Sequence, residues 1–145
     1  MKINGNEYTI EPEADLRWAD LRGADLSGAK GLLSPSAWME ANFEFTDKGV
    51  IVYKAFGDTH YNPPGKWKIE AGEYIEEVAN PNRTDDCGCG VNFATLDWIS
   101  KEWGSNITVW KCLIEWRDLP AVVVPYITDG KARCERLQLI EIVPQ

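Results

Sequence analysis

Histidine is almost absent from this sequence, since His60 is the only one among 145 residues. A single imidazole excludes metal sites built on two or more histidines, and it excludes a pair of histidines acting as acid and base. His60 lies in a loop rich in small polar residues, so we expect it to be solvated rather than catalytic.

Long apolar runs are missing as well. No stretch approaches the roughly 20 apolar residues that cross a bilayer, and the polar start Met1–Asn6 does not resemble a signal peptide. We therefore expect a cytoplasmic protein with no membrane partner and with reduced thiols.

The charged residues form no block of one sign. The formal net charge is −8, and the acidic side chains are spread over both halves of the chain. An acidic surface repels phosphate backbones, so we expect no direct binding of nucleic acid. Solubility is the simple interpretation of this acidity, and imitation of nucleic acid towards a DNA-binding partner is the alternative.

A five-residue repeat stands out at 14–33, where Ala-Asp-Leu occurs three times and a degenerate fourth copy follows. Leucines recur at 16, 21 and 26. On a helix each step of five residues leaves roughly 140° of drift, and on a strand successive leucines alternate faces. A coil that turns one corner every five residues points every Leu inward. A short helix and loop is the alternative, because Ala, Leu and Arg favour helices.

This Ala-Asp-Leu-x-x pattern resembles that of pentapeptide-repeat proteins, and the resemblance implies a square right-handed β-helix. The repeats here amount to one coil, which cannot bury a core without stacked neighbours. We therefore expect an N-terminal strand and short coil over 1–33, packed on the rest of the chain or on a second subunit. Trp18 occupies a repeat position that normally points outward, which predicts a contact with a partner.

The remaining chain, 34–145, is predicted to be one α+β domain, mostly antiparallel, with one or two helices. Ser34 and Pro35 are typical of a helix start, Gly104 of a helix end, and Asp129-Gly130 of a tight turn. The expected helices cover 35–42 and 94–103. The expected strands are 43–46, 50–56, 74–78, 107–116, 121–124 and 132–143.

The four cysteines give one close pair, Cys87 and Cys89, in a Cys-x-Cys spacing. Zinc sites usually use two close pairs, so zinc requires Cys112 and Cys134 to converge on the first two. A redox pair of Cys87 and Cys89 is a second hypothesis. The simplest expectation is no cofactor, with Cys112 in the core, Cys134 in a strand and the close pair in a loop.

Glycines flank Cys89 just before the second predicted helix, and such loops present backbone N–H groups to anions. The Walker pattern and Gly-x-Gly-x-x-Gly are both absent, so a simple turn is the alternative. Nearby basic residues would supply positive charge. The predicted ligand-binding residues are Arg83, Gly88, Gly90, Asn92, Lys131 and Arg133.

Four segments, 53–56, 87–95, 122–125 and 128–133, resemble uncharacterised domains that follow pentapeptide repeats in phage and bacterial proteins. Those domains often read Cys-x-x-Gly-[Leu/Ile]-His, and Asn92 stands where the His would be. The resemblance implies a phage-encoded accessory or anti-defence protein acting in the host cytoplasm. It supplies no activity.

Three functional hypotheses follow. The first is a non-enzymatic protein that binds a host macromolecule such as a protein, in which the coil completes the fold or a homo-oligomer interface. The second is a binder, or sponge, of a small anionic ligand such as a nucleotide-type signal, with Trp or Tyr stacked on the base. The third is a nucleotide-dependent transferase, for which no pair of nucleophile and base can be named.

Overall fold

The computed structural model describes residues 2–3, 6–7, 32–57 and 62–144. Most of the predicted repeat coil, together with Trp18 and His60, lies outside these ranges. At the N-terminus β1 (Lys2–Ile3) pairs with β2 (Asn6–Glu7) in antiparallel register.

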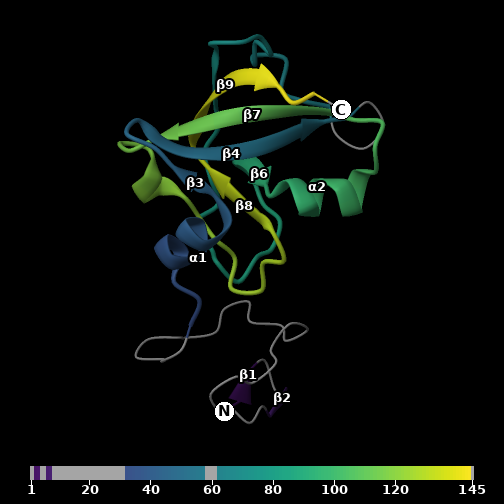
Figure 1. Ribbon diagram of the computed structural model, residues 1–145. Coiled ribbons are helices and arrows are strands. Elements are labelled where there is room, and N and C mark those ends of the chain that lie inside the picture. The colour runs from purple at the N-terminus through teal and green to yellow at the C-terminus, as the bar shows by residue number, and fades with distance from the viewer. Residues whose placement is uncertain (1, 4–5, 8–31, 58–61, 145) are drawn as a thin grey trace.

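Within 32–57 and 62–144, seven strands form one antiparallel sheet (Figure 1). Its order is β5-β9-β7-β4-β6-β8, and β3 pairs separately with β4. This confirms the mostly antiparallel α+β class. The strands are β3 (Glu44–Phe45), β4 (Gly49–Phe56), β5 (Tyr74–Glu76), β6 (Val91–Ala94), β7 (Thr108–Glu115), β8 (Lys131–Cys134) and β9 (Arg136–Ile142).

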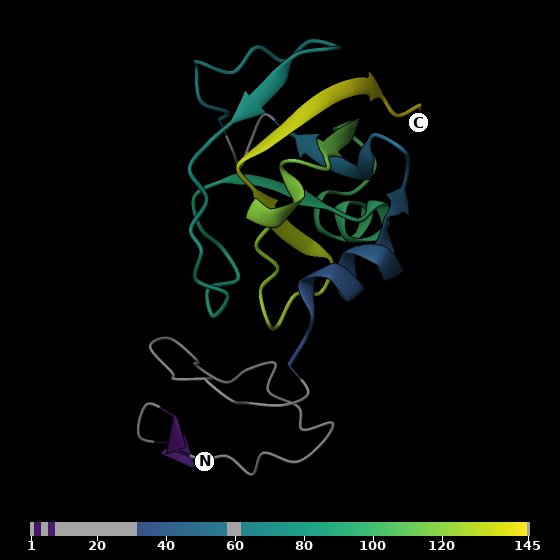
Figure 2. The same ribbon diagram turned by 90° about the vertical axis from the view of Figure 1, so that its left-hand side faces the viewer.

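The sheet curls because its last two strands are one chain segment bent at Glu135 (Figures 1 and 2). β8 pairs with β6, whereas β9 pairs with β7 on the opposite side of β4. One bent segment therefore runs along both sides of the sheet and turns it into a half-barrel. The sequence predicts a single strand over 132–143, and the exposed Glu135 at the bend is where this prediction fails.

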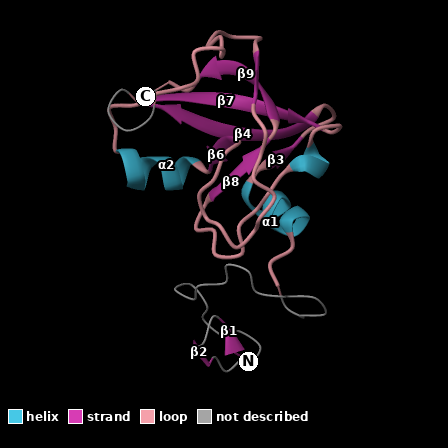
Figure 3. Ribbon diagram, turned by 180° about the vertical axis from the view of Figure 1, so that it is seen from behind, coloured by secondary structure: helices cyan, strands magenta, loops and turns pink. Residues whose placement is uncertain are grey.

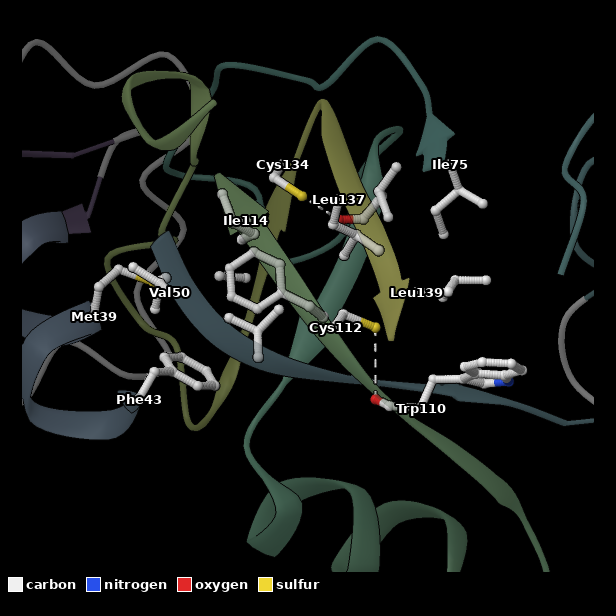
Figure 4. Packing of buried hydrophobic residues seen from close by; sticks show 14 of the residues in the cluster. Met39, Phe43, Val50, Ile75, Trp110, Cys112, Ile114, Cys134, Leu137 and Leu139 are labelled. Atoms are coloured by element: carbon white, nitrogen blue, oxygen red, sulfur yellow. Dashed lines mark hydrogen bonds between the residues drawn. The ribbon is translucent and has the colours of Figure 1, made fainter. Parts of the chain in front are cut away.

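The main core fills the inside of the curl (Figure 4). Side chains of Cys112, Ile114, Cys134 and Leu139 are fully buried there. Helix α1 (Pro35–Asn42) packs Trp38 and Met39 against this core. It starts as expected, because Ser34 Oγ accepts the Ala37 N–H and Pro35 occupies the first turn.

Helix α2 (Leu96–Trp103) lies on the other side of the sheet from α1 (Figure 3). Its Ile99 packs with Ala94 and Ile107 in a second, smaller core. The predicted helix over 94–103 begins two residues late, because Thr95 caps it and the preceding residues form β6. No helix in the described ranges is long and apolar enough to cross a membrane.

The predicted strand over 121–124 is wrong. Leu119–Ala121 forms a 3-10 helix, and only Val123 pairs with β8, exchanging backbone hydrogen bonds of 2.8 and 3.1 Å with Arg133. Pro125 stands at the next hydrogen-bonding position and has no N–H to donate. The ladder therefore ends after one pair.

Gly49 at the start of β4 allows β4 and β7 to approach closely. Its φ is +154°, and a Cβ there would lie 2.0 Å from the Ile114 carbonyl oxygen. We expect Gly49→Ala to lower the free energy of unfolding by at least about 2 kcal/mol, measured by urea denaturation. Gly65→Ala is the matched control, since a Cβ at Gly65 meets nothing within 4 Å. Equal effects of the two substitutions would contradict the packing argument.

Candidate functional site

A cavity of about 270 Å³ lies between α2 and the strands β4, β6 and β8. Aromatic and aliphatic side chains form most of its wall, and we refer to it as the aromatic cavity. Its lining residues are Tyr53, Lys54, Ala55, Asn92, Phe93, Ala94, Trp98, Ile99, Trp103 and Lys131.

The cavity reaches into the sheet because β4 and β6 separate. The two strands share only the Tyr53–Ala94 pair. Side chains alternate along a strand, so Tyr53 and Lys54 face opposite sides of the sheet, yet both line the cavity. Lys54 bridges the separated strands, since its Nζ donates a 2.7 Å hydrogen bond to the Asn92 carbonyl. Its amine therefore belongs to the inner end of the cavity.

Lys54 is a buried cation, with only 5% of its surface exposed. Its Nζ lies 5.2 Å from the Phe56 ring centroid and 5.5 Å from that of Trp67, so the rings stabilise the charge. Burial lowers the pKa of Lys54 from its usual 10.5 to about 8, and the Cys112 and Cys134 thiols oppose the shift. Burial also raises the pKa of the Cys112 thiol to about 12.

The lowered pKa of Lys54 makes stability depend on pH. Between about pH 8 and 10.5 the unfolded chain holds a proton on Lys54 that the folded protein has lost, so stability rises with pH. We expect the unfolding free energy of the native protein to rise by about 3 kcal/mol relative to Lys54→Met across this range. Urea denaturation from pH 7 to 10.5 measures the difference.

Lys54→Arg is the control for this experiment, because its guanidinium stays charged throughout the range and no such rise is expected. If the unfolding free energies of the native protein and Lys54→Met changed in parallel with pH, the folded protein would not shift the pKa of Lys54.

Two tryptophans of α2 form the outer wall of the aromatic cavity. The Trp98 indole is held in place, since its Nε1 donates a 2.8 Å hydrogen bond to Asp129 Oδ1. The Lys131 ammonium lies 5.7 Å from the centroid of the same ring. The cavity thus combines four aromatic residues, Tyr53, Phe93, Trp98 and Trp103, with two lysines.

Lys131 also touches the loop before β6. Its Nζ lies 2.7 Å from Cys87 Sγ, and the Cys87 side chain is exposed. A second cavity, of about 400 Å³, shares Trp98 and Lys131 with the first. Because Asp86, Glu102 and Asp129 also line it, we refer to it as the acidic cavity.

Of the predicted ligand-binding residues, Asn92 and Lys131 line the aromatic cavity. Asn92 Nδ2 donates to the carbonyls of Gly88 and Gly90 at 3.4 Å each, which joins the glycine loop to the cavity wall. The glycines do not precede a helix directly, because β6 lies between Gly90 and α2. The glycines therefore do not lie at the helix start that the sequence predicts.

The two predicted arginines do not line the cavity, and their guanidinium groups bind the chain itself. Arg83 donates to the Val124 carbonyl at 2.7 Å and the Leu33 carbonyl at 2.6 Å, and its guanidinium lies 4.1 Å from the Tyr126 ring centroid. Arg83 therefore ties the start of the domain to the chain before β8.

Arg133 is fully buried and organises the loop before β6, which we name the 80–90 loop. Its guanidinium donates to three carbonyls, those of Asn80 at 2.8 Å, Asn82 at 2.6 Å and Asp85 at 3.0 Å. Burial lowers the pKa of Arg133, and the Asp85 carboxylate opposes the shift. This loop has no regular secondary structure, and the guanidinium supplies the hydrogen-bond donors that a neighbouring strand would otherwise provide.

Arg133→Met would leave the carbonyls of Asn80, Asn82 and Asp85 without their donor. We expect the unfolding free energy to fall by about 3 kcal/mol or more, because hydrogen bonds to a charged group are lost in a buried place. Arg117→Met is the control, since that side chain is 66% exposed and its ion pairs are worth about 1 kcal/mol at most. Urea denaturation compares the two, and equal losses would contradict the role of Arg133.

The cysteines divide into two environments. Cys112 and Cys134 are buried in the core. Their thiols donate hydrogen bonds to the carbonyls of Trp110 and Val91, at 3.5 and 3.6 Å respectively (Figure 4). Cys87 and Cys89 are exposed. In the part of the chain that the structure describes, no group of three or more His, Cys, Asp or Glu side chains is arranged to hold a metal ion.

Sequence reasoning missed eight of the ten lining residues, among them Tyr53, Lys54, Trp98 and Trp103. One of them carries a signal, because Lys54 interrupts the otherwise apolar run from Val50 to Phe56. A lysine in a buried strand marks a specific environment. The tryptophans carry no comparable signal, since core packing accounts equally well for any of the seven.

Comparison with known proteins finds one similarity. Residues 12–30 match the family model described as pentapeptide repeats (8 copies). No curated protein and no solved structure matches the chain. The comparisons therefore support the five-residue repeat predicted from the sequence, and they lend no support to a phage or bacterial origin of 34–145.

Proposed function

We propose that residues 34–145 bind a small planar anion, such as a nucleotide-type molecule, in the aromatic cavity. The observation that carries the proposal is the combination of four aromatic residues with the ammonium groups of Lys54 and Lys131 in one cavity. Stacking of a base on an aromatic ring is worth about 1–3 kcal/mol, and the lysines supply charge for an anionic group.

The size and surroundings of the cavity favour a ligand with one base. A volume of about 270 Å³ lies at the lower limit for drug-sized ligands. A longer ligand would extend into the acidic cavity, where the carboxylates of Asp86, Glu102 and Asp129 oppose further phosphates. We therefore favour a nucleoside monophosphate or a similar compound over a cyclic oligonucleotide.

Thermal unfolding and tryptophan fluorescence with a panel of nucleoside mono- and diphosphates, cyclic dinucleotides and ADP-ribose test this proposal. A ligand at one hundred times its dissociation constant stabilises the protein by about 2.7 kcal/mol. We expect a nucleoside monophosphate to bind. We expect Lys131→Gln to lower the affinity for it about tenfold, because a hydrogen bond from a charged group is lost.

Lys48→Gln is the matched control for the ligand measurement, because Lys48 is an exposed lysine in the turn between β3 and β4. Equal affinity of the native protein and Lys131→Gln, or a panel with no ligand, would overturn the proposal.

A second candidate function is binding of a host macromolecule, as in a phage-type anti-defence protein. The observation in its favour is the pentapeptide-repeat match at 12–30, which contains Trp18. Under this proposal Trp18→Ala abolishes the interaction with the partner, whereas Lys131→Gln leaves it unchanged. The opposite pattern would favour the small-molecule site.

A further inference from the structure

We propose that Cys87 and Lys131 form a site of oxidative modification. Oxidation by a peroxide would join the two side chains through a covalent bond between sulfur and nitrogen. Lys131 Nζ lies 2.7 Å from Cys87 Sγ. The thiolate is the form of cysteine that peroxides oxidise, and the Lys131 amine lies within reach of the sulfur once it is oxidised. The Cys87 side chain is exposed, so a small oxidant reaches it.

Both partners are held in position by the surrounding structure. Lys131 belongs to β8 and pairs with Ala94 of β6. Cys87 follows the part of the 80–90 loop that the buried Arg133 guanidinium binds, and the Asn80 N–H donates to the Cys89 carbonyl at 2.9 Å. The contact therefore joins a strand to a loop that hydrogen bonds hold on both sides.

The reaction balances with peroxide as the only co-reactant. The Cys87 thiolate attacks one oxygen of hydrogen peroxide, the O–O bond breaks, and Cys87 sulfenic acid and hydroxide are formed. The hydroxide removes one proton from the Lys131 ammonium. The free amine then attacks the sulfur, an S–N bond forms, and the sulfenic oxygen leaves as water. Sulfur is oxidised, peroxide is reduced, and two waters are produced overall.

The cross-link would change the aromatic cavity, because Lys131 lines it. A nitrogen bonded to sulfur is no longer an ammonium, so the cavity loses the positive charge of Lys131. Weaker binding of an anionic ligand after oxidation is thus expected; this consequence, unlike the cross-link itself, rests on the proposed function.

Peptide mass spectrometry of the full chain after treatment with hydrogen peroxide tests the cross-link. We expect a species lighter by two hydrogens, in which the peptide containing Cys87 is joined to that containing Lys131, and dithiothreitol should reverse it. The cross-link should form in Cys89→Ser and should be absent from Lys131→Arg, which keeps the charge but has no primary amine.

The rate of peroxide oxidation at Cys87, followed by labelling of the remaining thiol, gives a second readout. Cys89 serves as an internal reference, since it is also an exposed thiol on the same loop. We expect the Cys87 thiol to be lost in both the native protein and Lys131→Gln, but as the cross-link only in the native protein, and we expect Cys89 to be unaffected by the substitution. A Cys87–Cys89 disulfide as the sole product, or oxidised Cys87 without the cross-link, would overturn the proposal. These outcomes do not depend on whether the cavity binds a nucleotide.

Discussion

The buried guanidinium of Arg133 is the contact on which the rest of the candidate site depends. It binds three carbonyls of a loop that has no regular secondary structure, and its own backbone pairs with Val123 on one side and Asn92 on the other. Burial of an arginine is unfavourable unless its donors are satisfied, and here three carbonyls provide the acceptors. The position of Cys87 beside Lys131 follows from this arrangement.

The separation of β4 from β6 has a physical cost that the chain offsets locally. Two neighbouring strands that share one pair leave backbone groups without ladder partners. Lys54 satisfies the Asn92 carbonyl and gains two aromatic neighbours, at the expense of a buried charge. A fully paired sheet would be simpler, but it would close the inner end of the aromatic cavity.

Much of the fold could be predicted because its signals are local. Ser34 with Pro35, Gly104, and the alternation in β4 and β7 each act within a few residues, and the structure agrees with them. The site is different, since Tyr53, Trp98 and Lys131 lie far apart in the sequence and meet only through the strand order. The alternation of side chains along a strand does not reveal which segment covers each face of the sheet. The sequence therefore predicts Arg133 as a ligand-binding residue, although the 80–90 loop encloses its side chain. At Pro125, by contrast, a local rule does predict the structure, because a residue without an N–H cannot continue the hydrogen-bonded ladder.

The bent segment formed by β8 and β9 has a consequence for how the protein folds during synthesis. Cys134, Leu137 and Leu139 contribute to the same core as residues of α1 and β4. The half-barrel therefore cannot close until the ribosome has made the chain through Ile142. Until then β6 and β7 have unpaired edges and the core is exposed, a state in which nascent chains depend on chaperones or aggregate. Folding of this domain therefore waits for β9 and is dominated by contacts between distant parts of the chain.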